Sequence, residues 1–107
     1  MDEKQYNKLV RDNIPDIIRN DGNIPVTRVL GNDEYIACLH EKLQEEVAEY
    51  LKDNSLEELC DVWEVLEAIS SVMEFSKDEI ERTKLEKAEK NGVFKDRIFL
   101  EKVIVSN

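Results

Sequence analysis

The sequence predicts a mainly α-helical protein. Three glycines and two prolines in 107 residues favour long regular elements with few turns. Apolar residues recur at helical spacing in two long segments, and two Ser-x-x-Glu pairs are typical of helix starts. We therefore expect an antiparallel helical core of three main helices, with a short N-terminal helix and a small two-stranded β-ribbon. The length fits a single domain over residues 1–107.

The first elements are expected to be a short helix and a strand. Residues 14–20 are expected to form the helix, which the turn residues Asp21 and Gly22 end. Residues 24–30 are rich in β-branched side chains and follow this turn, so they are expected to form the strand.

Two long helices should then form a hairpin. The first is expected over residues 33–52, and the second over residues 56–74, where Ser55 and Glu58 fit a capping box. The break at residues 53–55 is too short for anything but an antiparallel connection. One apolar stripe on the first helix predicts the core, with Ile36, Leu39, Leu43, Val47, Tyr50 and Leu51.

The C-terminal third should hold one more helix and a strand. Ser76 and Glu79 fit a second capping box, and Asn91-Gly92 is a typical helix end. Residues 97–105 are expected to form a strand that pairs with residues 24–30. Because a two-stranded ribbon is marginal alone, it would have to pack on the helices.

The charge excludes two classes of partner. A net charge of −10 disfavours both nucleic acid and anionic membranes as binding partners. A polyphosphate ligand would therefore need divalent cations between itself and the protein. Two cysteines without CxxC spacing, a polar N-terminus and no apolar run of ~18 residues point to a cytoplasmic protein with reduced thiols.

Two acid-x-x-acid pairs predict a metal site. Glu46 and Glu49 lie on the first long helix, and Glu58 and Asp61 lie on the second. Residues three apart share a helix face, so each pair can converge on one point. Four carboxylates from adjacent antiparallel helices offer the all-oxygen shell that Mg²⁺ or Mn²⁺ prefers.

The position of the second pair strengthens this hypothesis. Glu58 and Asp61 fall on an otherwise apolar side of their helix, with Val65, Ala68 and Val72. Unpaired carboxylates are costly there, and a cation would compensate them. The alternatives are that Glu58 serves only in the capping box with Ser55, and that the acids are ordinary solvated charges.

The order of these motifs resembles that of a known enzyme superfamily. Glu46-x-x-Glu49 followed by Glu58-x-x-Asp61 resembles the paired acidic motif of the MazG-like all-α nucleoside triphosphate pyrophosphohydrolases. Residues 7–15 look like the opening of a phosphoribosyl-ATP pyrophosphohydrolase-like branch. The C-terminal segment with Lys84, Lys87, Lys90, Gly92-Val93-Phe94 and Arg97-Ile98 resembles the basic C-terminal segment of that branch. The gap between the two acidic motifs is shorter here than in many members, so both helices are expected to be shorter at the ends that the connection joins.

The resemblance implies a fold, an activity and a metal. It implies a helical core that assembles as a dimer or tetramer. The implied activity is hydrolysis of the α–β phosphoanhydride bond of a nucleotide substrate, which gives a monophosphate and pyrophosphate with Mg²⁺ as cofactor.

Residue roles follow as hypotheses. The expected metal ligands are Glu46, Glu49, Glu58 and Asp61, and Glu45 or Glu49 is expected to orient or deprotonate the attacking water. The candidate phosphate contacts are Lys8, Arg11, Lys84, Lys87 and Arg97. The rival hypothesis is a non-catalytic helical module that serves oligomerisation or nucleotide sensing.

Overall fold

The protein is mainly helical, as expected. The computed structural model describes residues 2–106, and within them it contains four helices and no strand. The chain divides into two compact units, Met1–Glu74 and Phe75–Asn107. The first unit holds α1 (Ile14–Asn20), α2 (Asn32–Asp53) and α3 (Leu56–Val72), and the second holds α4 (Lys77–Asn91).

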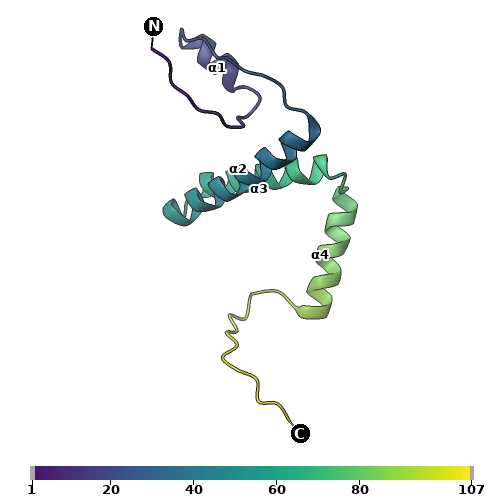
Figure 1. Ribbon diagram of the computed structural model, residues 1–107. Coiled ribbons are helices and arrows are strands. Elements are labelled where there is room, and N and C mark those ends of the chain that lie inside the picture. The colour runs from purple at the N-terminus through teal and green to yellow at the C-terminus, as the bar shows by residue number, and fades with distance from the viewer. Residues whose placement is uncertain (1, 107) are drawn as a thin grey trace. The chain divides into compact units, whose positions relative to one another are not determined.

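The helical hairpin of α2 and α3 forms the body of the first unit. The two helices lie side by side and pack on each other (Figure 1). Only Asn54 and Ser55 separate them. Asn54 adopts the left-handed conformation, with φ 52° and ψ 32°, and its N–H donates to the Tyr50 carbonyl at 2.7 Å. Asn tolerates this conformation better than most residues, so it can end α2 and reverse the chain within two residues.

The core lies between α2 and α3. Leu39 of α2 and Val65 of α3 are 3% and 8% exposed, and they are the only buried residues of segment 2–106. Ala68 and Val72 of α3 are half-buried, as are Leu43 and Tyr50 of α2. The expected apolar stripe of α2 is therefore confirmed over most of its length, although Val47 and Leu51 are exposed.

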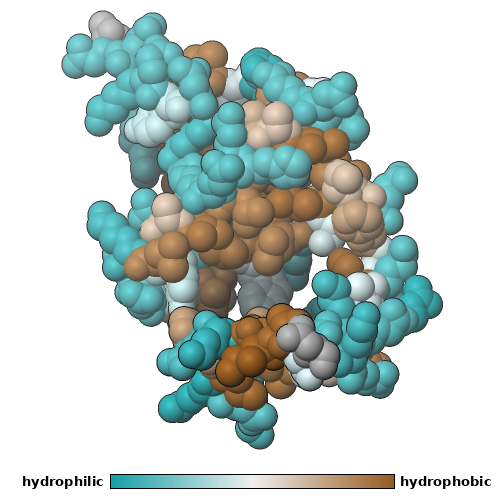
Figure 2. All heavy atoms as spheres, turned by 60° about the horizontal axis from the view of Figure 1, so that its bottom comes forward, coloured by the Kyte–Doolittle hydropathy of each residue, from teal (hydrophilic) through white to brown (hydrophobic). Residues whose placement is uncertain are grey.

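The outer face of α3 remains open to solvent. This face carries Leu59, Trp63 and Leu66 of α3 and the C-cap residue Met73, which recur at helical spacing and are 37%, 59%, 43% and 43% exposed. Apolar side chains, in brown, are visible at the molecular surface in Figure 2. Hydrophobic residues thus occupy two sides of α3, but only one side has a partner within the first unit.

The second unit starts with a complete capping box. The Ser76 hydroxyl accepts from the Glu79 N–H at 3.1 Å, and the Glu79 carboxylate accepts from the Ser76 N–H at 3.1 Å. The helix ends at Gly92, whose φ of 82° favours glycine. No residue of α4 is buried. The role of α4 as the third helix of the core stays a prediction, as does the single domain.

The expected β-ribbon is wrong for the described residues. Segments 24–30 and 97–105 carry no strand. Val26 and Val29 are 96% and 99% exposed, and Ile98 and Ile104 are 85% and 84% exposed. β-Branched residues favour an extended chain, but a strand forms only where backbone groups find a partner and side chains find a packed face. Neither segment has them.

An ion pair joins the segment before α2 to the first turn of that helix. The Arg28 guanidinium binds the Glu34 carboxylate through two hydrogen bonds, at 2.6 and 2.8 Å. This contact raises the pKa of Arg28 and lowers the pKa of Glu34, chiefly through the hydrogen bond.

No helix within residues 2–106 is long and apolar enough to cross a membrane.

Candidate metal centre

The two acidic helices bring three carboxylates together. Glu46 of α2 and Glu58 and Asp61 of α3 each place a carboxylate oxygen within 4.8 Å of the other two. All three residues are half-buried, and the Glu46 side chain is only 12% exposed. Because α2 and α3 pack face to face, helical spacing on each helix directs these acids to the same place.

A second group of acids adjoins the first and shares Glu58 with it. Glu49, Asp53 and Glu58 also place their oxygens within 4.8 Å of one another. All four expected metal ligands therefore belong to one acidic cluster, which we define as Glu46, Glu49, Asp53, Glu58 and Asp61.

Asp53 was missed by the sequence interpretation. It was assigned to the break between the helices, but α2 continues through it. Glu46, Glu49 and Asp53 follow one another at spacings of three and four, which puts them on one helix face. This spacing was the signal that could have identified Asp53.

The surroundings of Glu58 separate its two possible roles. The Ser55 hydroxyl accepts from the Glu58 backbone N–H at 3.2 Å, so Ser55 caps α3 as expected. The reciprocal bond, in which the Ser55 N–H would donate to the Glu58 carboxylate as the Ser76 N–H does to Glu79 in α4, does not form here. The carboxylate of Glu58 instead lies among the other acids.

The electrostatic environment of Glu58 is unfavourable for its charged form. Partial burial raises the pKa of Glu58, and the neighbouring carboxylates of Asp61, Asp53, Glu49 and Glu46 raise it further. A proton or a bound cation would relieve the same repulsion. The acidic cluster thus has both the geometry and the charge that favour cation binding.

Three basic side chains lie at or beside this cluster. The Arg11 guanidinium lies 2.7 Å from the Asp61 carboxylate, in a charge-assisted hydrogen bond. Lys42 of α2 lies 3.3 Å from Glu46 and 3.4 Å from Glu45. Lys8 lies 3.9 Å from Glu45 and 5.9 Å from the centre of the Tyr6 ring.

The expected catalytic and phosphate residues divide into two groups. Glu49 belongs to the acidic cluster, but Glu45 belongs to neither carboxylate group and pairs with lysines instead. Arg11 reaches the cluster from the N-terminal segment through Asp61, whereas Lys8 pairs with Glu45, which lies outside the cluster.

The other three expected phosphate contacts, Lys84, Lys87 and Arg97, belong to the second unit, where Lys84 pairs with Glu81 at 3.7 Å. The phosphate role of all five cations stays a prediction.

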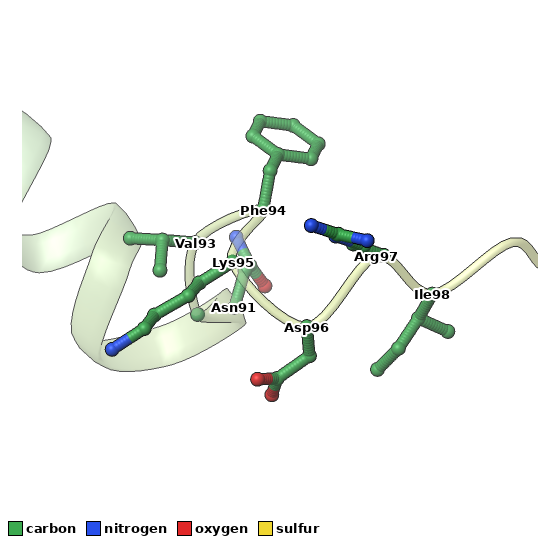
Figure 3. Close-up of a pocket in the computed structure, with 8 residues that line it drawn as sticks. Asn91, Val93, Phe94, Lys95, Asp96, Arg97 and Ile98 are labelled. Carbon is green, nitrogen blue, oxygen red and sulfur yellow. The ribbon is translucent and has the colours of Figure 1, made fainter.

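The second unit also contains a hollow of about 530 Å³. It is lined by the consecutive residues Asn91–Ile98, which are all exposed. Figure 3 shows Phe94 and Asp96 pointing in opposite directions from the bend in the chain. A hollow formed by one exposed bend, with Asp96 as its one carboxylate, lacks the converging polar groups of a ligand site.

The dimensions of the acidic cluster suit a small divalent cation. Octahedral Mg²⁺ binds oxygens at about 2.0–2.1 Å, so two ligand oxygens are at most about 4.2 Å apart. The ligand oxygens of each group all lie within 4.8 Å of one another, so side-chain rotations suffice to bring them to one cation. The donors are all carboxylates, the hard oxygen ligands that select Mg²⁺ or Mn²⁺ over softer metals.

Comparison with known proteins identifies one partial relative. A segment of 42 residues, or 39% of the chain, is 60% identical to an uncharacterized protein of Mycolicibacterium smegmatis. The match spans 43% of that relative, less than half of its length. No family model matches the chain, and no solved structure matches it.

Proposed function

We propose that the protein is a cytoplasmic, Mg²⁺-dependent pyrophosphohydrolase, acting on a nucleoside triphosphate or a phosphoribosyl-ATP-like substrate. The observation that carries the proposal is the acidic cluster, in which carboxylates from two facing helices approach within 4.8 Å. The order of its motifs along the chain also resembles the MazG-like superfamily. In a protein of net charge −10, a bound cation would offset the repulsion between these acids and a triphosphate.

Each acid has a role in this proposal. Glu46, Glu58 and Asp61 are half-buried and would hold the cation, with Glu49 and Asp53 at its more exposed side. When bound, Mg²⁺ supplies neutralisation of the triphosphate charge and acidifies a nearby water. Glu49 is the exposed member of the cluster one turn from Glu46, and in this proposal it accepts the proton of the attacking water. The products are the monophosphate and pyrophosphate.

The N-terminal cations would bind the substrate phosphates. Arg11 and Lys8 lie beside the acids and are 57% and 45% exposed at their side chains, so they can contact a ligand. A guanidinium suits this role because its fork matches phosphate oxygens. Lys84, Lys87 and Arg97 are assigned the same role on the resemblance alone.

We also propose that the protein works as a homo-oligomer, a dimer or tetramer. Leu39 and Val65 are the only buried residues of segment 2–106, which is a small core for a chain of this length. The outer face of α3 carries Leu59, Trp63, Leu66 and Met73, and a second copy would cover it.

A substrate panel tests the proposed activity. Purified protein is incubated with Mg²⁺ and ordinary or damaged nucleoside triphosphates, and released pyrophosphate is measured. We expect release from at least one substrate and none when chelator removes the metal. The matched controls are Glu41→Gln and Glu57→Gln, which alter exposed acids of α2 and α3 outside the cluster. Both should keep full activity.

A non-catalytic oligomerisation or nucleotide-sensing module is the second candidate. The open apolar face of α3 favours it, because such a face serves assembly whether or not chemistry occurs. The melting temperature with and without Mg²⁺ separates the oligomerisation module from the enzyme. Clustered carboxylates repel one another without a cation, so Mg²⁺ should raise the melting temperature of the enzyme. An unchanged melting temperature supports the module.

A further inference from the structure

Arg11 is hydrogen-bonded to Asp61, one of the metal ligands of the proposed site. It belongs to the N-terminal strap, residues 2–13, which contains no helix or strand. Its guanidinium contacts Asp61 Oδ1 at 2.7 Å, across fifty positions of sequence. The same Asp61 carboxylate lies within 4.8 Å of Glu46 and Glu58.

A guanidinium and a divalent cation compete at one carboxylate. Both are positive, and two such charges a few ångströms apart repel strongly. A cation that enters between Asp61, Glu46 and Glu58 would therefore weaken the contact of Arg11 with Asp61. The contact itself is partly exposed, 57% for Arg11 and 39% for Asp61, so breaking it costs only about 0.2–1 kcal/mol, or up to about fivefold in affinity.

Lys42 cannot play the same part. It pairs with Glu46 at 3.3 Å from four positions earlier on the same helix, and its side chain is only 18% exposed. The backbone of α2 fixes the Cα of Lys42 one turn from Glu46, so its ammonium can move only within the reach of its side chain. Arg11 is carried by irregular chain, so it can leave the cluster with little cost to the fold.

We infer that Arg11 is a displaceable counter-ion of Asp61, which a divalent cation releases and which then binds a phosphate of the ligand. This inference rests on the proposed function, since it assigns an order of binding at the same site. The cation binds first, and the freed guanidinium then takes the phosphate. By linkage, a phosphate ligand that holds Arg11 away from Asp61 strengthens cation binding to the same extent.

Calorimetric titration with Mn²⁺ alone gives the first test. Arg11→Ala should bind Mn²⁺ about three- to fivefold more tightly than the unaltered protein, because the competing contact is gone. Lys4→Ala is the matched control. It removes the same charge from the same strap, but Lys4 is exposed and forms no ion pair within residues 2–106. It should change Mn²⁺ affinity by less than about twofold.

Two further readouts follow the guanidinium itself. With Mn²⁺ saturating, inorganic pyrophosphate should bind roughly tenfold more weakly to Arg11→Ala than to the unaltered protein, because a charge-assisted contact is lost. With Mg²⁺, the ¹⁵N order parameters of residues 8–12 should fall in the unaltered protein. In Arg11→Ala they should already be low before Mg²⁺ is added.

Each contrary outcome points to a different error. Equal Mn²⁺ affinity of Arg11→Ala and the unaltered protein would overturn the counter-ion role and leave the metal site standing. Unchanged order of residues 8–12 in the Mg²⁺-bound protein would show that Arg11 stays on Asp61, and would overturn displacement. Absence of Mn²⁺ and Mg²⁺ binding to every variant would overturn the proposed metal site and this inference together.

Discussion

Arg11 and Asp61 form a 2.7 Å contact between an irregular N-terminal segment and the middle of a helical hairpin. Local structure does not produce this pairing, because the two residues lie fifty positions apart. The contact brings the strap to the two acidic helices and places a cation next to their carboxylates. The candidate site is therefore built from three segments of the first unit: the strap, α2 and α3.

Removing one ligand charge should abolish the proposed reaction without unfolding the protein. Asp61→Asn and Glu46→Gln keep side-chain shape but remove a charged oxygen donor from the acidic cluster. We expect loss of Mg²⁺-dependent pyrophosphate release in both, with an unchanged circular dichroism spectrum. Glu41→Gln, on an exposed face of α2, should remain fully active. Normal turnover by either cluster variant would remove that residue from the metal shell.

Asp53→Asn should have a smaller effect than Glu46→Gln. Asp53 is exposed and belongs to the second group of acids, with Glu49 and Glu58. Glu46 is half-buried and lies beside Glu58 and Asp61 in the first group. Water can replace an exposed ligand more easily than a buried one. Mn²⁺ titration of both variants measures this order, and a weaker effect of Glu46→Gln would contradict it.

Glu58→Gln should separate the ligand role from the capping role. Gln also serves in a capping box, so a purely structural Glu58 predicts normal activity. A ligand predicts a loss of activity by orders of magnitude. Ser55→Ala gives the opposite pattern, a loss of about 1 kcal/mol in the free energy of unfolding with activity largely kept, because it removes the cap of α3.

The same Glu58→Gln variant should differ from the unaltered protein in its pH dependence. The pKa of Glu58 is raised above its ordinary value of 4.5 in the folded protein, chiefly by burial. The folded state thus holds this proton more tightly than the unfolded chain. Stability from this group is full below pH 4.5 and falls as the pH rises through the folded-state pKa.

Urea unfolding without metal should therefore show the variant more stable at pH 7, with the gap closing at pH 4. A gap that widens on acidification would contradict the raised pKa of Glu58.

Trp63→Glu should dissociate the proposed oligomer. Trp63 is the largest side chain of the open α3 face and is 59% exposed in the single chain, so the change costs the monomer little. A charge at the centre of an apolar interface costs far more. Light scattering should show monomers, while Glu67→Gln, an exposed position of α3, should leave the assembly intact. A monomeric unaltered protein at micromolar concentration would refute the oligomer.

Asn54→Val should destabilise the hairpin by about 1–2 kcal/mol, because a β-branched residue is strained in the left-handed conformation. Asn54 has φ 52° and ψ 32° there. Asn54→Gly should cost much less, since glycine adopts this conformation freely. Chemical denaturation of the two variants provides the comparison, and equal stability would contradict the assigned backbone geometry.

Local signals in the sequence predicted the helices well. The bounds of α1 agree with the expected residues 14–20 because Asp21 and Gly22 end it, and α4 begins directly after its capping residue Ser76. α2 extends one residue further at each end than expected, and α3 ends at Val72 instead of residue 74. Differences of one or two residues are usual at helix ends, because the terminal turns fray.

Features that depend on distant contacts were harder to predict. The expected strands did not form, because β propensity favours an extended backbone but supplies no neighbouring strand to pair with it. The acidic cluster was largely found, since helical spacing and a short connection determine where its carboxylates meet. The Arg11–Asp61 pairing has no local signature in the sequence, and only the structure identifies it.

The two-residue link at Asn54 and Ser55 has a consequence for insertion of foreign peptides. An added residue there would separate the left-handed Asn54, which ends α2, from Ser55, which caps α3 one turn before the Glu58 N–H. The exposed turn at Gly22 and Asn23 lies between α1 and the irregular segment before α2, so its length does not affect the hairpin. An epitope or a fluorescent reporter is therefore better grafted into that turn than at the hairpin tip, where it would disturb the cap next to the acids.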